Sequence, residues 1–98
     1  MRLLPALLAI AVLAGCGPVQ STSTLMDAEV ALEAARAAGA RENATYEYVS
    51  AEAYLKKARE TANRARYEYS KDYARKAVEL AKEAREKALA ASNRKEAP

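Results

Sequence analysis

The sequence predicts an all-α fold, in which a short N-terminal helix precedes an antiparallel hairpin of two Ala-rich helices, giving a three-helix arrangement. Two patterns favour this fold. Small apolar residues, mostly Ala, recur at alternating steps of three and four, the spacing of one face of a helix. Lys, Arg and Glu are interleaved between them, as on the solvated sides of helices. Since the chain contains no Phe or Trp, its core must be thin.

The first 15 residues have the order of a secretory signal peptide. Met1 and Arg2 form a short positive region, and residues 3–13 form an apolar stretch, too short for the roughly 20 residues of a transmembrane helix. The stretch ends in four residues that resemble the bacterial lipobox: Leu13, Ala14, Gly15 and Cys16. The resemblance implies that the Cys16 thiol receives diacylglycerol and that cleavage removes residues 1–15. No other cofactor is expected.

The residues after Cys16 predict where the protein is held. Acyl chains on one residue anchor a protein stably. By resemblance to the sorting of Gram-negative lipoproteins, Gly17 in place of Asp favours the outer membrane, on its periplasmic side. Residues 16–24 are polar and predict a flexible tether.

The helical domain is expected over residues 25–93. Thr24 and Asp27 resemble a capping box, and an apolar stripe follows until Gly39, so the first helix is predicted near 25–39. Its stripe is Leu25, Ala28, Leu32 and Ala35.

Two further stripes predict the hairpin. The second is Ala51, Leu55, Ala58, Ala62 and Ala65, and the third is Ala74, Ala77, Ala81, Ala84, Ala88 and Ala91. Ser50 and Ser70 are the expected N-caps. The two stripes are half a turn out of phase, so a break around residues 67–70 is needed to let them face each other. An extended coiled coil is the alternative, and a disordered tail is expected at residues 94–98.

The aromatic residues of the chain are all Tyr, and they lie near the expected helix entries. They are Tyr46, Tyr48, Tyr54, Tyr67, Tyr69 and Tyr73. One interpretation is that the rings fill space at the hairpin ends where Ala leaves room. The other is an interaction surface for a glycan or a partner protein.

Four segments of the chain together resemble a known family. They are 38–40 (AGA), 46–48 (YEY), 51–60 (AEAYLKKARE) and 69–74 (YSKDYA). The family resembled is a group of bacterial envelope lipoproteins, frequent in myxobacteria, whose domain is labelled DUF4398. The resemblance covers about residues 28–90. It implies a helical bundle and assigns no catalytic or binding residue.

The composition disfavours an enzyme. With no His and a single Cys, the chain has no zinc site, Cys–His pair or Ser–His–Asp triad. Its net charge of +3 is spread out, so nucleic acid is not an expected partner. We expect a membrane-anchored structural or interaction protein that docks on another envelope protein or on itself. The alternative is a peptidoglycan-associated coiled-coil spacer resembling the major outer-membrane lipoprotein.

Overall fold

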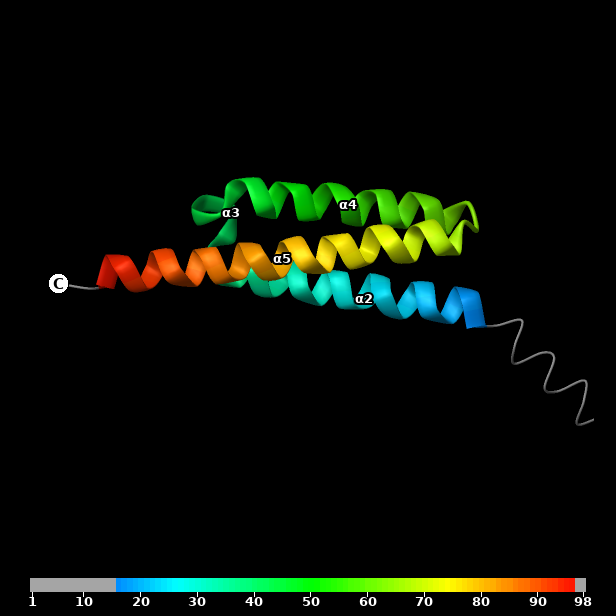
Figure 1. Cartoon of the computed structure of the whole chain (residues 1–98), viewed down its shortest axis with the longest axis horizontal. Coiled ribbons are helices and arrows are strands. Elements are labelled where there is room, and N and C mark those ends of the chain that lie inside the picture. The colour runs from blue at the N-terminus through cyan, green and yellow to red at the C-terminus, as the bar shows by residue number, and fades with distance from the viewer. Residues whose placement is uncertain (1–15, 97–98) are drawn as a thin grey trace, which may run out of the picture.

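In a computed structural model, which describes residues 16–96, the chain forms four α-helices (Figure 1). They are α2 (Cys16–Ala37), α3 (Ala40–Asn43), α4 (Thr45–Asn63) and α5 (Tyr67–Glu96). No β-strand occurs in this part of the chain, so the predicted all-α class is confirmed. Since α3 is a single turn, three long helices make the fold.

Helix α5 is the shared element of the bundle. It packs extensively against both α2 and α4, whereas α2 and α4 meet each other less. Along the bundle, α4 runs antiparallel to α5, and α2 runs parallel to α5 (Figure 1). The predicted hairpin is therefore α4 with α5, and α2 is the third helix beside it.

The core of the bundle consists largely of Ala. The buried residues of the three long helices are Ser21, Ala28 and Ala35 in α2, Glu47, Tyr48, Ala51, Leu55 and Ala58 in α4, and Ser70, Ala74, Ala77, Ala81, Ala84 and Ala88 in α5. Apart from Glu47, successive buried residues within each helix are three, four or seven residues apart, so each set lies on one helix face. Small side chains on that face let the helix backbones approach closely. Because each Ala buries little apolar area, stability depends on this close contact.

The first helix is longer than predicted. We expected a flexible tether over residues 16–24 and a helix over 25–39, but α2 runs from Cys16 to Ala37. The buried stripe continues back to Ser21, four residues before Leu25. The tether prediction was wrong because a polar residue can occupy the buried face when its hydroxyl finds a partner.

The predicted helix ends were also wrong. Thr24 is not a cap, because its hydroxyl donates to a backbone carbonyl one turn earlier in α2. Ser50 and Ser70 lie inside α4 and α5, which begin at Thr45 and Tyr67. The expected disordered tail at 94–98 is helical through residue 96, since Lys, Arg, Glu and Ala are good helix formers.

The break between the second and third helices is a tight turn centred on Ala65. The amide of Arg66 donates to the carbonyl of Thr61 at 2.8 Å, and the amide of Ala65 donates to that of Ala62 at 2.9 Å. This is the Schellman pattern, and Ala65 has the left-handed conformation it requires, with φ 59°. The predicted break is confirmed, but it precedes the expected residues 67–70 and removes Ala65 from the second stripe. One continuous helix is excluded.

We expect Ala65→Gly to stabilise the bundle by about 0.5–1 kcal/mol, because the left-handed conformation costs Ala more than Gly. The equivalent position after α2 already has Gly39, with φ 86°. The urea midpoint should rise for Ala65→Gly and fall for Ala53→Gly, a matched change at an exposed position inside α4. A fall for both variants would contradict the assignment of Ala65.

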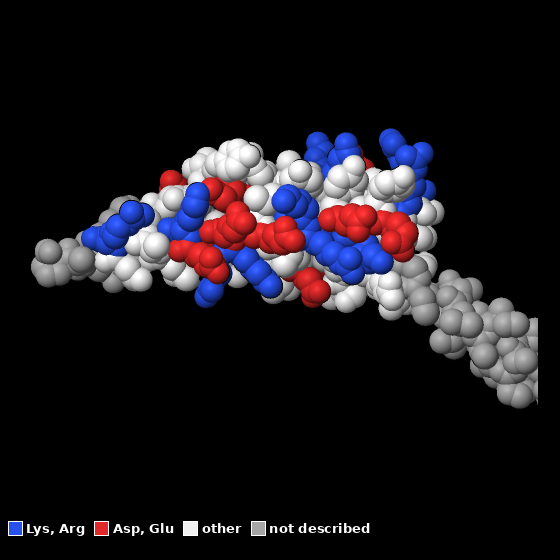
Figure 2. All heavy atoms as spheres, viewed as in Figure 1, with Lys and Arg blue, Asp and Glu red and all other residues white. Residues whose placement is uncertain are grey.

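Charged side chains of both signs cover the face of the bundle seen in Figure 2, interleaved and without a large patch of either sign. Several form ion pairs, such as Arg36 with Glu33 and Arg59 with Glu29, each at 2.7 Å. Exposed pairs of this kind each contribute about 0–1 kcal/mol. These charged side chains mainly keep the outer faces of the helices in contact with water. The Arg59–Glu29 pair also joins α4 to α2.

Candidate functional site

The residue predicted to be lipidated, Cys16, is the first residue of α2. The other predicted lipobox residues, Leu13, Ala14 and Gly15, lie outside the described residues, as does the rest of the predicted signal peptide.

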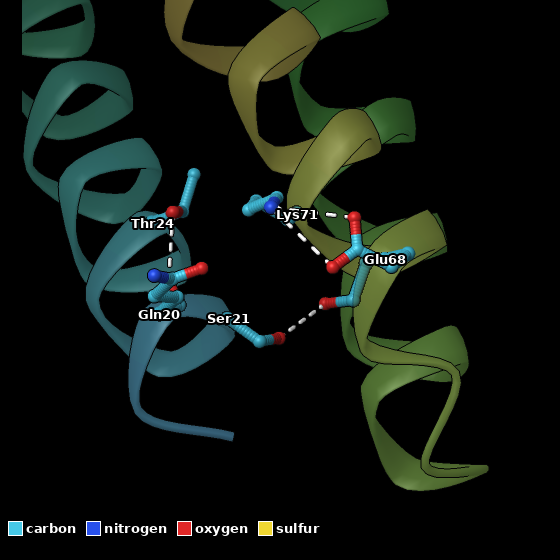
Figure 3. A network of polar contacts seen from close by, with 6 residues as sticks. Gln20, Ser21, Thr24, Glu68 and Lys71 are labelled. Carbon is cyan, nitrogen blue, oxygen red and sulfur yellow. Dashed lines mark hydrogen bonds and ion pairs between the residues drawn. The ribbon is translucent and has the colours of Figure 1, made fainter. Parts of the chain in front are cut away.

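A buried pair of hydroxyls sets the register of α2 against α5 (Figure 3). Ser21 and Ser70 are 1% and 0% exposed, and the Ser21 hydroxyl donates to the Ser70 hydroxyl oxygen at 2.9 Å. The two helices are parallel, and each rises about 1.5 Å per residue. Counting back three residues from each Ser puts Pro18 level with Tyr67, the first residue of α5, so Cys16 lies two residues closer to the end of the bundle. The start of α2 and the α4–α5 turn therefore lie at the same end of the bundle (Figure 1).

Three of the six tyrosines are packed into the bundle. Tyr48 is 3% exposed and lies in a cluster of Ala residues from α2, α3 and α5. The half-buried rings of Tyr54 and Tyr73 join α4 to α5, with centroids 6.2 Å apart. The Lys57 ammonium lies 5.8 Å from the centre of the Tyr73 ring. These rings contribute to packing between helices.

The other three tyrosines do not form one surface. Tyr46, 77% exposed, lies at the start of α4. Tyr67 and Tyr69, the latter 61% exposed, begin α5 at the opposite end of the bundle. The structure therefore does not bring the six predicted residues together, and only Tyr67 and Tyr69 begin a helix at the end that contains Cys16.

An apolar face on the outside of α2 was missed in the sequence. Val19, Met26 and Val30 are 67%, 60% and 69% exposed. Their steps of seven and four keep them on one side of the helix, opposite the buried Ala28 and Ala35. The signal for this face is a second apolar stripe half a turn away from the first.

An ion pair joins the start of α4 to the far half of α5. The Lys87 ammonium donates to the Glu47 carboxylate, which is nearly buried. This hydrogen bond is the main reason that the pKa of the Glu47 carboxyl is lowered, and the hydrogen bond from the backbone amide of Glu47 is the second. The same contact raises the pKa of the Lys87 ammonium. Both shifts mean that the folded state favours the charged pair.

We expect Glu47→Gln to lower the melting temperature at neutral pH and to flatten its dependence on pH. Because the folded pKa of Glu47 is lowered, its contribution is present above the usual value of 4.5 and is lost as the pH falls through the folded value. Because the folded pKa of Lys87 is raised, its contribution is present below 10.5 and is lost as the pH rises through the folded value.

Thermal melts across the acid range check this expectation. The difference between Glu47→Gln and the parent should shrink as the pH drops below the usual pKa of Glu47. Glu60→Gln, a matched change at an exposed position of α4, should leave the profile unchanged. If the two variants gave the same profile, the contact with Lys87 would not stabilise the fold.

Within the part of the chain that the structure describes, no three His, Cys, Asp or Glu side chains form a group that could hold a metal ion. None of the described helices combines the length and hydropathy needed to cross a bilayer. Comparisons with protein-family models, with curated proteins and with solved structures find no match to this chain.

Proposed function

We propose that this chain is a lipid-anchored protein of the bacterial cell envelope, held on the periplasmic side of the outer membrane by acyl chains on Cys16. One observation carries the proposal. The apolar stretch over residues 3–13 is followed by two small residues and a Cys, the order of a lipobox. Each methylene of the attached lipid that enters the bilayer contributes about 0.8 kcal/mol, so two or three chains anchor the protein stably.

The bundle itself then has a structural or interaction role, without catalysis. The exposed Met26 and Val30 on α2 support this role, because the outer face of a solvated helix is ordinarily polar. An envelope protein or a second copy of the chain would cover this face. A photocrosslinker at Val30 should capture that partner, whereas one at the buried Tyr48 should not.

Replacing Cys16 by Ser tests the anchor. We expect Cys16→Ser to abolish incorporation of labelled palmitate in cells and to release the protein from the membrane fraction, because the hydroxyl does not replace the acylated thiol. Ser23→Ala, at an exposed position of α2, should keep both label and membrane association. Palmitate on the Cys16→Ser variant would overturn the proposed anchor.

A further inference from the structure

We propose that the turn between α4 and α5 is a second membrane contact, at which Arg64 and Arg66 bind the phosphate groups of anionic phospholipids. The bundle would then stand on the bilayer with this end down and the α3 end away from it. The inference rests on the lipid anchor proposed at Cys16, and it adds the part of the fold that faces the membrane.

The first step is the register of the helices. The Ser21–Ser70 hydrogen bond places Pro18 level with Tyr67, so Cys16 lies at the same end of the bundle as the turn that contains Arg64 and Arg66. Lipid on Cys16 inserts below the headgroups, so a turn at the same end of the bundle is held at headgroup depth. No movement of the bundle is needed to bring the arginines to the surface.

The second step is charge. Both Arg64 and Arg66 are exposed, and among the described residues neither forms an ion pair. The carboxylate nearest to Arg66 along the chain, Glu68, is paired with Lys71 at 3.3 Å (Figure 3). Residues 16–26 of α2 contain no charged residue, so nothing there offsets the two positive charges. Guanidinium groups with free donors match phosphate oxygens well.

The third step is the set of neighbouring side chains. Val19 lies one turn after Cys16 and is 67% exposed. Tyr67 and Tyr69 begin α5 directly after the turn. Tyr and Arg beside apolar groups are typical of segments at the boundary between headgroups and acyl chains. This end of the bundle therefore suits a lipid surface.

A different orientation is conceivable, in which the outer face of α2 lies flat on the bilayer. Met26 and Val30 would then be the main contacts. They are ten and fourteen residues from Cys16, or roughly 15 and 21 Å along the helix. A bundle standing on the α4–α5 turn keeps both residues off the surface, so substitutions there separate the two orientations.

The test uses the mature chain, residues 16–98, with Cys16→Ser, so that no acyl chain contributes. This chain includes every described helix. Its partitioning onto vesicles of phosphatidylcholine, with and without phosphatidylglycerol, is measured by sedimentation. We expect binding only to the anionic vesicles, weakened by salt. Arg64→Gln with Arg66→Gln should lower the partition coefficient about 25-fold, because each basic residue near an anionic surface contributes roughly fivefold.

The matched control is Arg85→Gln with Arg94→Gln, which removes the same charge at exposed positions far from the turn. It should change partitioning by less than about twofold. An equal loss in this control, a larger loss for Met26→Gln with Val30→Gln, or no binding of the parent to anionic vesicles would each overturn the proposal. Since no lipidation is involved, these results are independent of the palmitate test of the anchor.

Discussion

Replacing Tyr48 by Ala is expected to unfold most of the bundle at room temperature. Tyr48 is 3% exposed and is the only aromatic side chain in its buried cluster, where Ala35, Ala84 and Ala88 surround it. Truncating a buried aromatic ring costs about 3–5 kcal/mol, and a core of this size supplies only about 3–5 kcal/mol in all. The buried Ala neighbours are too short to fill the cavity, and the one longer apolar side chain packed against the cluster, Leu32, is only partly buried.

Circular dichroism and urea denaturation check this result. Tyr46→Ala is the matched control, because Tyr46 lies on the same helix and is 77% exposed. We expect the control to change stability by no more than about 0.5 kcal/mol. If Tyr48→Ala were as stable as Tyr46→Ala, Tyr48 would not be part of the core.

Ala74→Leu is expected to have a comparable effect by the opposite mechanism. Ala74 is 0% exposed and packs in one cluster with Ala28 of α2 and Ala58 of α4, where three helices meet. A larger side chain forces the backbones apart, and overpacking typically costs about 1–3 kcal/mol, sometimes more. The cost is high here because separating the helices also loosens their other Ala contacts.

The measurement is the urea midpoint of Ala74→Leu compared with that of Ala53→Leu, an identical change at an exposed position of α4. We expect a large fall for Ala74→Leu and little change for Ala53→Leu. Equal midpoints would mean that the helices do not need small residues to approach each other.

The hairpin was predictable because its information is local. The spacing of Ala74, Ala77 and Ala81 directly predicts the buried face of α5. The second and third stripes are half a turn out of phase, so a break between them is required. The position of the break was less predictable, since Ala65 takes a left-handed conformation that usually calls for Gly. Hydrogen bonds from the turn to the end of α4, rather than residue type, determine where that helix ends.

The N-terminal part of α2 was not predicted, because residues 16–24 were judged by their polarity and not by their spacing. Ser21 continues the spacing of the buried stripe of α2. As a polar residue it suggests a tether, unless Ser70 is known to lie opposite it. Two buried hydroxyls that bond to each other remove the cost that either would have alone. The packing role expected of the tyrosines holds for Tyr48, but its place in the second stripe, three residues before Ala51, was not recognised.

The candidate functional site was also predictable only in part. Lipidation of Cys16 could be proposed from sequence because the lipobox is a contiguous pattern. The neighbourhood of Arg64 and Arg66 could not, since it depends on α2 and α5 lying parallel in one register. No spacing within a single helix contains that information.

The most direct test of the lipid anchor is mass spectrometry of the tryptic N-terminal peptide from the membrane-bound protein. The account predicts a peptide that begins at Cys16, ends at Arg36 and has the added mass of diacylglycerol and an N-linked acyl chain. A peptide that retains residues 3–15, or one that begins at Cys16 without lipid, would contradict it.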